Sequence, residues 1–280
     1  MTVADALRQG TADLAAAGVA APRLEAELLL GRATGRERQA LLINSNEPVS
    51  VSGRSRFMAL VKQRNRRVPL QQILGETEFY GLRILVNGQV MAPRPETEIL
   101  VDEVLKRWRP EFRTILDIGT GSGCIAISLA KHLPESTVEA IDASEPALEM
   151  ARQNIRLHGL EDRASAIHGD IFPDDTTTYD VIVSNPPYIP TCDIETLMPE
   201  VSQHEPRIAL DGGPDGLDYY RKISVGLGRR LNRSGMVALE VGDGQADKVG
   251  KLISNAVPGL TIEVVKDLAG LERVVVANQD

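Results

Sequence analysis

Residues 114–124 read Thr-Ile-Leu-Asp-Ile-Gly-Thr-Gly-Ser-Gly-Cys, an apolar run that passes into three alternating glycines. The run is short and rich in β-branched residues, which favours a β-strand, and a helical pattern starts at Cys124. Glycine lets the turn between strand and helix approach a ligand closely, and the helix N-terminus offers free N–H groups. The segment therefore predicts a strand–loop–helix unit whose loop binds a ligand.

The sequence after this unit alternates between strand and helix patterns. Helical patterns at residues 145–158, 219–231 and 245–256 separate most of the apolar runs, which indicates a doubly wound α/β sheet. Only residues 266–273 join the last two strands, too few for a crossover helix, so these strands should form an antiparallel hairpin. Such a sheet is typical of class I methyltransferases. The expected strands after the first are residues 138–141, 164–168, 181–184, 236–241, 261–265 and 274–277.

Before residue 93 the chain predicts two smaller parts. Residues 1–75 read as a small helical domain, in which Thr2 caps a first helix and Pro22 begins a second that should end at Gly31. A third helical stretch covers residues 55–66. Residues 76–92 read as a linking β-hairpin, with Asn87-Gly88 as its turn. The catalytic domain is then expected over residues 93–280.

Composition narrows the class of protein. With 42% hydrophobic and 25% charged residues, the 280-residue chain has the composition of a globular protein. Its net charge of −8 argues against direct nucleic-acid binding. The two cysteines and four histidines lack metal-ligand spacing, so no metal is expected. No apolar run approaches the ~20 residues of a membrane-spanning helix, and no signal peptide is seen. The expectation is a cytoplasmic monomer with no membrane association.

The glycine loop indicates a nucleoside cofactor. Asp142 ends the next expected strand, where a carboxylate can accept both ribose hydroxyls. A dehydrogenase loop has a similar pattern, but Cys124 occupies the place of its third glycine. Asp117 before the loop fits the methyltransferase version, so S-adenosyl-L-methionine is the expected cofactor. The residues assigned to it in this loop are Asp117, Gly119, Thr120, Gly121, Ser122 and Gly123.

A further cofactor contact is expected after the third strand of this sheet, at residues 168–172. In this fold the segment faces the adenine. Asp170 can accept a hydrogen bond from the exocyclic amine, and either Ile171 or Phe172 can cover the ring.

Residues 185–188 read Asn-Pro-Pro-Tyr at the end of the fourth strand and are expected to perform the chemistry. The Asn185 side-chain oxygen and the Pro186 carbonyl can accept both hydrogens of a planar –NH₂ group, which turns its delocalised lone pair toward the methyl donor. Pro187 removes a competing donor, and Tyr188 offers a face for the flat amide. Asn185, Pro186 and Tyr188 are the predicted catalytic residues. All four bind the substrate, and Asn185 also contacts the cofactor.

With these motifs the chain resembles the HemK/PrmC family, the release factor glutamine N5-methyltransferases. The resemblance implies a helical N-terminal domain that docks a peptide chain release factor. It also implies a catalytic domain that methylates the glutamine of the Gly-Gly-Gln motif at N5. The similar blocks extend over nearly the whole chain in the order of the family: residues 69–75 (Pro-Leu-Gln-Gln-Ile-Leu-Gly), 94–98 (Arg-Pro-Glu-Thr-Glu), 117–130, 184–190, 204–213 and 239–242.

Two alternatives share the Asn-Pro-Pro-Tyr box: glutamine methylation of a ribosomal protein and N6-adenine methylation of a nucleic acid. Residues 94–98 favour release factors, because ribosomal-protein enzymes usually lack this segment and adenine methyltransferases lack it. Gln72 stands where the family commonly has tyrosine, which concerns packing at the domain junction. Residues 53–67 contain six basic residues and no acid, which fits either a solvated helix face or a docking surface.

Overall fold

The computed structural model describes residues 1–278 and divides them into two compact units. One unit contains Met1–Glu76 together with Met198–His204. The other contains the remaining described residues, in the segments Thr77–Leu197 and Glu205 onward. Among residues 1–278, no helix combines the length and the apolar character that crossing a membrane requires.

The first unit is a bundle of short helices around an apolar core. A capping box joins Thr2 and Asp5 at the start of α1, which confirms the expected first turn. Pro22 begins α2 as predicted, but the predicted end at Gly31 is wrong: the helix continues to Thr34, and Gly35 is the left-handed cap. The helices are α1 (Val3–Ala16), α2 (Pro22–Thr34), α3 (Arg38–Ile43), α4 (Val51–Asn65) and α5 (Leu70–Leu74).

Gly31 lies inside α2 because there is no room for a side chain there. A Cβ atom at this position would come within 2.9 Å of the Arg36 carbonyl oxygen. The glycine therefore permits close backbone packing, and the end of the helix is set by the positive φ of Gly35, at 70°.

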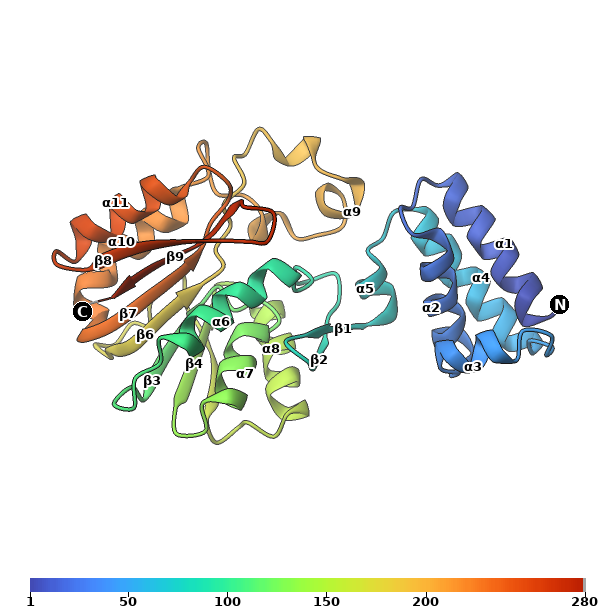
Figure 1. The fold of residues 1–280 in the computed structure, drawn as a ribbon, viewed down its shortest axis with the longest axis horizontal. Helices are drawn as coiled ribbons and strands as arrows, with labels where there is room; N and C mark the ends of the chain where they lie inside the picture. The colour runs from blue at the N-terminus through green and yellow to red at the C-terminus, as the bar shows by residue number, and fades with distance from the viewer. Residues whose placement is uncertain (279–280) are drawn as a thin grey trace. The chain divides into compact units, whose positions relative to one another are not determined.

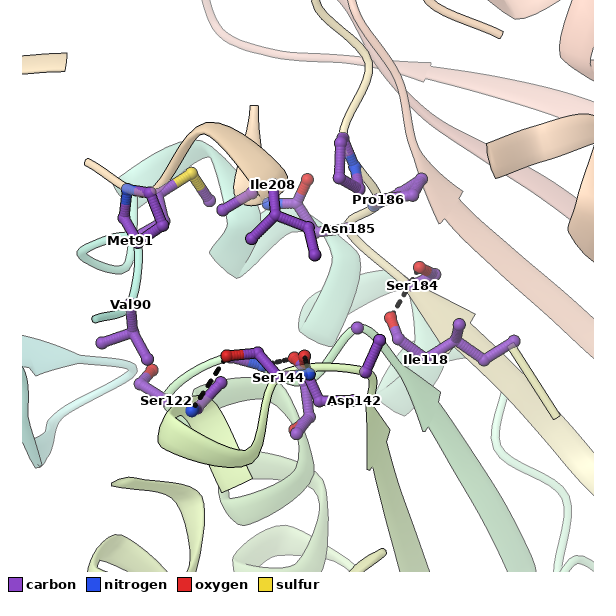
Figure 2. Close-up of a pocket in the computed structure, with 18 of the residues that line it drawn as sticks. Val90, Met91, Ile118, Ser122, Asp142, Ser144, Ser184, Asn185, Pro186 and Ile208 are labelled. Atoms are coloured by element: carbon purple, nitrogen blue, oxygen red, sulfur yellow. Dashed lines mark hydrogen bonds between the residues drawn. The ribbon is translucent and has the colours of Figure 1, made fainter. Parts of the chain in front are cut away.

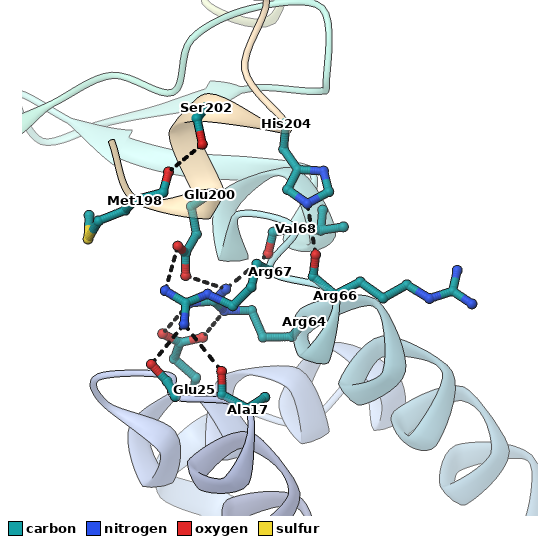
Figure 3. A network of polar contacts seen from close by, with 11 residues as sticks. Ala17, Glu25, Arg64, Arg66, Arg67, Val68, Met198, Glu200, Ser202 and His204 are labelled. Carbon is teal, nitrogen blue, oxygen red and sulfur yellow. Dashed lines mark hydrogen bonds and ion pairs between the residues drawn. The ribbon is translucent and has the colours of Figure 1, made fainter. Parts of the chain in front are cut away.

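A buried polar network holds the short helix α9 (Pro199–Ser202) on this bundle (Figure 3). Arg64 of α4 lies 2.5 Å from a Glu25 oxygen and 2.8 Å from a Glu200 oxygen. Arg67 binds the other Glu200 oxygen at 2.7 Å. Two of the six basic residues in segment 53–67 therefore make internal ion pairs, while Arg54, Arg56, Lys62 and Arg66 are exposed.

Gln72 also contacts the α9 segment within this unit. Its amide nitrogen donates to the His204 carbonyl at 3.2 Å, and a His204 ring nitrogen lies 2.8 Å from the Arg66 carbonyl oxygen.

A two-stranded sheet of β1 (Glu76–Phe79) and β2 (Leu82–Leu85) follows. Its turn was predicted at Asn87-Gly88, and that prediction is wrong. The chain turns at Tyr80 and Gly81, both with positive φ, at 52° and 71°. The strain at Tyr80 is offset by two hydrogen bonds, from its N–H to Glu98 at 2.7 Å and from its hydroxyl to Asp102 at 2.6 Å. Asn87 instead forms a separate turn after β2.

The second unit is built on a seven-stranded sheet in the order β5-β4-β3-β6-β7-β9-β8. Five strands are parallel neighbours, and β9 is antiparallel to both β7 and β8, as the short last connection predicted. The strands are β3 (Thr114–Ile118), β4 (Thr137–Asp142), β5 (Ala164–His168), β6 (Tyr179–Ser184), β7 (Leu231–Glu240), β8 (Thr261–Lys266) and β9 (Glu272–Asn278).

The sheet buries a separate apolar core on each face. Successive residues of a strand point to opposite faces, so Ile115 and Leu116 of β3 belong to different cores. Helices α6 (Glu98–Lys106), α7 (Cys124–His132) and α8 (Glu145–Leu157) cover one face. Helices α10 (Asp218–Arg230) and α11 (Ala246–Ala256) cover the other (Figure 1). Burial on both sides explains why the strands read as nearly continuous apolar runs.

Candidate functional site

A pocket opens at the carboxyl ends of β3, β4 and β6, where the strand order reverses around β3 (Figure 2). This is the position at which doubly wound sheets bind ligands, because loops from neighbouring strands diverge there. Of the predicted site residues, the pocket is lined by Gly119, Thr120, Gly121, Ser122, Asp142, Asp170, Ile171, Asn185, Pro186 and Pro187.

The glycine loop adopts a conformation that other residues would resist. Gly119, Gly121 and Gly123 have φ values of 69°, 57° and 81°. The N–H groups of Gly119 and Thr120 donate to the Ile141 carbonyl at 2.8 and 3.0 Å, which binds the loop to the end of β4. Gly123 does not line the pocket; it is the left-handed residue that begins α7.

Asp117 lies behind the loop and supports it. The carboxylate is fully buried and accepts from the Thr120 hydroxyl at 2.6 Å and from the Ala126 N–H at 3.2 Å. Its second oxygen has no hydrogen-bond partner within residues 1–278. Burial raises the Asp117 pKa to about 7, although the two hydrogen bonds act in the opposite direction. A cation in the adjacent pocket would favour the charged form of this carboxyl group.

Asp142 lies at the end of β4 with its carboxylate in the pocket wall. One oxygen accepts from the Gly121 N–H at 2.9 Å, and the other accepts from the Ser144 N–H at 2.8 Å. These two bonds fix the carboxylate and leave a lone pair on each oxygen. Burial raises its pKa, which backbone donors partly counteract. The arrangement fits a bidentate acceptor for a pair of vicinal hydroxyls.

In the segment after β5, the structure distinguishes between the two residues that were predicted to cover an adenine ring. Ile171 is buried and lines the pocket, whereas Phe172 does not. The Phe172 ring instead packs against Gly226 of α10, where an added Cβ would lie 2.3 Å from a ring carbon. Asp170 lines the pocket but also pairs with Lys222 at 3.0 Å. The Tyr219 side chain, which the sequence reasoning missed, joins Ile171 in the wall.

The Asn-Pro-Pro-Tyr box forms the wall at the end of β6. Asn185, Pro186 and Pro187 line the pocket, but Tyr188 does not. The backbone beside the box is packed so closely that a Cβ on Gly212 would lie 2.8 Å from the Tyr188 Cα. The need for this close approach accounts for the glycine at position 212, for which the sequence reasoning had found no structural role, while Gly213 has a positive φ of 87°.

Polar residues that the sequence reasoning did not assign to the site lie against the box, and one of them, Thr97, also lines the pocket. Asn185 donates from Nδ2 to the Thr97 hydroxyl oxygen at 3.1 Å. The Tyr188 hydroxyl lies 3.5 Å from an oxygen of Glu240, at the end of β7. Thr97 and Glu240 are 2% exposed each, and burial raises the Glu240 pKa to about 7. Both residues stand in segments quoted for the family resemblance, which was the only signal that marked them.

Other residues of the site also escaped the sequence reasoning. Asn154, on α8, is fully buried, and its side-chain nitrogen donates to the Ser122 carbonyl at 2.9 Å. The same amide group exchanges two hydrogen bonds with the backbone of Leu85. Val90 and Met91 line the pocket on the side opposite Pro186, and Ile208 lines it beside Asn185 (Figure 2). Apolar wall residues carry no motif, so only the fold could assign them.

Cys124, at the start of α7, is a buried free cysteine, and burial raises its thiol pKa to about 12. Among the described residues, no group of three or more acidic, cysteine or histidine side chains is placed to hold a metal ion.

Together the sheet order, the glycine loop, the acidic strand end and the Asn-Pro-Pro-Tyr box define a class I S-adenosylmethionine-dependent methyltransferase. Residues 5–75 match the PrmC N-terminal domain, and residues 95–200 match the methyltransferase small domain. The release factor glutamine methyltransferase of Geobacter sulfurreducens is 43% identical over 94% of this chain and 91% of its own length. That of Moorella thermoacetica is 42% identical over 99% and 98%. The chain belongs to the release factor glutamine methyltransferase family.

Solved structures support the fold assignment. A methyltransferase from Pyrococcus furiosus superposes with a TM-score of 0.51 at 21% identity, covering 72% of this chain and 90% of its own. The hMettl16 catalytic domain in complex with a MAT2A 3'UTR hairpin gives 0.58 at 18% identity, covering 75% and 81%. At these identities the likeness establishes the sheet architecture alone.

Proposed function

We propose that this protein transfers a methyl group from S-adenosylmethionine to the side-chain amide nitrogen, N5, of the glutamine in the Gly-Gly-Gln motif of peptide chain release factors. Membership of the release factor glutamine methyltransferase family supports the substrate. The observation that carries the chemistry is the placement of Asn185 and Pro186 in the wall of a pocket that also contains the glycine loop.

The residues present fit the cofactor. Asp142 has a free lone pair on each oxygen, and Ile171 offers an apolar face. Behind the loop, one oxygen of the Asp117 carboxylate has no partner in the described part of the chain. We assign the ribose hydroxyls to Asp142 and the adenine to Ile171, with Asp170 as acceptor for its amine. When bound, S-adenosylmethionine supplies a methyl group on a sulfonium, and the acidic groups near the loop favour that positive charge.

The box would act on the target amide by orientation. An amide nitrogen is a poor nucleophile because its lone pair is delocalised into the carbonyl group. Asn185 Oδ1 and the Pro186 carbonyl oxygen each accept a hydrogen bond from one N–H group of the target amide. These two hydrogen bonds prevent rotation of the –NH₂ group and stabilise the positive charge that develops on its nitrogen. The proton leaves after transfer, so no base is needed beforehand. Tyr188 remains the predicted packing face for the amide, although it lies outside the pocket wall.

The helical unit is the proposed docking part for the release factor. We divide the chain into a docking domain at residues 1–75, a linking hairpin at 76–92 and a catalytic domain at 93–280. The exposed basic residues Arg54, Arg56, Lys62 and Arg66 of segment 53–67 form the proposed docking face, since Arg64 and Arg67 are committed internally. A substrate that acts in translation places the protein in the cytoplasm, where we expect a monomer.

Mass spectrometry tests the function directly. A release factor is incubated with the protein and S-adenosylmethionine, digested, and its Gly-Gly-Gln peptide is analysed. The proposal expects that peptide to gain the mass of one methyl group on the glutamine. Incubations with a ribosomal protein and with an adenine-containing oligonucleotide test the two alternatives. Methylation of either one, with none on the release factor, contradicts the proposal.

A further inference from the structure

The side chain of Asn185 has two ends of nearly the same shape and opposite hydrogen-bonding roles. The amide clamp needs the oxygen, not the –NH₂ group, to meet the target glutamine. A neighbouring group must therefore select one of the two orientations. The Thr97 hydroxyl is in place to do so, because its oxygen lies 3.1 Å from Asn185 Nδ2.

Glu240 can set the direction of the Thr97 hydroxyl. As a hydrogen-bond donor, this hydroxyl lowers the pKa of the Glu240 carboxyl group, and the buried Glu240 Oε2 atom has no hydrogen-bond partner within residues 1–278 that would occupy it. A hydroxyl carries a single hydrogen. Once that hydrogen is donated to Glu240, the oxygen of Thr97 can only accept. It then pairs with the amide nitrogen of Asn185 and disfavours the amide oxygen on that side.

Glu240 is held firmly enough to serve this role. It is the last residue of β7, its side chain is buried, and its backbone carbonyl accepts from the Tyr220 hydroxyl at 2.8 Å. The Tyr188 hydroxyl approaches its carboxylate at 3.5 Å. No described contact commits Thr97 or Glu240 to the cofactor loop. Thr97 itself lines the same pocket as Asn185.

We propose that Thr97 and Glu240 are positioning residues that orient the Asn185 amide so that its oxygen faces the substrate. The proposal rests on the function proposed above, because it assumes that Asn185 accepts a hydrogen bond from the target amide. It gives a physical role to the Arg94–Glu98 and 239–242 segments, whose members Thr97 and Glu240 stand 143 positions apart in the sequence.

 The two segments are far apart in the chain, and helix α6 (Glu98–Lys106), which directly follows η1 (Pro95–Thr97), packs against β7.

The charge on Glu240 makes the arrangement sensitive to pH. Burial raises the Glu240 pKa to about 7. Above that pH the carboxylate accepts from Thr97, and the orientation of Asn185 is fixed. Below it the protonated acid can itself donate to Thr97, which frees the hydroxyl hydrogen for Asn185 and permits the reversed amide. The groups that face Glu240 and influence its charge are Thr97, Arg273, Tyr188 and Glu96, of which Glu96 alone raises the pKa.

Three variants test the proposal in the full-length protein. Thr97→Val removes the hydroxyl and keeps the shape, Thr97→Ser keeps the hydroxyl, and Glu240→Gln removes the titration. We expect Thr97→Val to lower kcat on a release factor by about 10- to 100-fold, less than the ~10²–10³ typical of losing a direct contact at the reacting centre. Thr97→Ser, which keeps the hydroxyl, should have a rate near that of the wild type. Calorimetry should show unchanged cofactor affinity for all three.

The pH profile separates a positioning role from a structural one. With saturating cofactor, kcat of the wild type should fall as the pH drops through about 7, the pKa of Glu240. Glu240→Gln should lose this acid limb. Saturation is needed because the Asp117 pKa is also about 7, and its titration would act on cofactor binding. If Thr97→Val does not fold, the profile of Glu240→Gln decides the question.

Asn185→Ala distinguishes a failure of the positioning role from a failure of the proposed function. If Asn185→Ala is inactive while Thr97→Val turns over at the wild-type rate, the positioning role is wrong and the function stands. An unchanged acid limb in Glu240→Gln also overturns the positioning role. If Asn185→Ala itself retains the wild-type rate, the amide clamp fails.

Discussion

The side-chain nitrogen of Asn185 lies 3.1 Å from the hydroxyl oxygen of Thr97, which is 88 residues earlier in the chain. This contact commits one end of the amide to the protein interior and leaves the oxygen as the acceptor for a substrate. A strand-end motif and a short helical turn thus combine into one hydrogen-bonding unit. The predictions below test this unit, the cofactor residues and the helical domain.

Asn185→Ala should lower the methylation rate of a release factor by about 10²–10³, because one acceptor for the target amide is lost. Cofactor affinity should change much less, since Asp142 and the glycine loop remain. Asn185→Asp is the matched comparison: it nearly preserves the shape and still accepts, so part of the activity should survive. Rate measurements at saturating cofactor decide. Wild-type rates in both variants would mean that the box is only a structural turn.

Asp142→Ala should weaken S-adenosylmethionine binding by about 2–4 kcal/mol if the carboxylate accepts both ribose hydroxyls, since hydrogen bonds to a charged group contribute ~1.5–3 kcal/mol each and do not add fully. Calorimetry measures the effect. Asp170→Ala is the comparison, and its effect should be smaller because Asp170 is exposed and paired with Lys222. An unchanged affinity for Asp142→Ala would remove this residue from the cofactor site.

Asp117→Asn should change how stability depends on pH. Burial raises the folded-state pKa of Asp117 from 3.8 to about 7, so its stabilising contribution is complete below pH 3.8 and is lost as the pH rises through 7. Asparagine keeps an acceptor for Thr120 and Ala126 and has no charge to bury. The variant should be more stable than the wild type at pH 8, by about 1–3 kcal/mol, and little changed at low pH. Equal urea midpoints for Asp117→Asn and the wild type at pH 8 would show that the buried carboxylate does not lower the free energy of unfolding.

Glu200→Ala should destabilise the helical unit by about 1.5–3 kcal/mol, because Arg64 would lose one of its two carboxylate partners in a buried network and would keep Glu25. Glu47→Ala is the control, since its pair with Arg36 is exposed and should contribute less than about 1 kcal/mol. Hydrogen exchange should report faster opening of residues 198–204 and α4 in Glu200→Ala alone. Equal protection from hydrogen exchange in Glu200→Ala and Glu47→Ala would show that the buried network does not hold residues 198–204 on the bundle.

Charge reversal at Arg54, Arg56 and Lys62 tests the docking face. The triple substitution to glutamate should raise KM for an intact release factor and leave methylation of a short Gly-Gly-Gln peptide unchanged. These side chains are exposed, so folding should be little affected. Lys251→Glu, on α11, is the control for a change of surface charge elsewhere. If the intact substrate is methylated as well as before, the basic face is only a solvated surface.

The strands and the chemical motifs were readable from the sequence because each is encoded locally. Residues 114–118 form a strand with the predicted limits, since an apolar run buried on both faces of a sheet needs little context. Residues 164–168 also form a strand with the predicted limits, although this strand lies at the sheet edge and is only partly buried. The capping pair Thr2 and Asp5 is likewise a local signal. The predicted hairpin turn at Asn87-Gly88 failed because the hydrogen bonds from Tyr80 to Glu98 and Asp102, more distant in sequence, stabilise a turn at Tyr80-Gly81.

The sequence by itself determined the fold class, the family and the residue types of the site, because periodicity, glycine spacing and the Asn-Pro-Pro-Tyr box are short-range patterns. Only the tertiary structure decided which residues complete the site. Thr97 meets Asn185, and Glu240 meets Tyr188, through packing of separate elements, and Ile171 rather than Phe172 faces the pocket. Burial also raises the pKa of Asp117 to about 7, an effect that depends on the surroundings of the side chain and not on its neighbours in sequence.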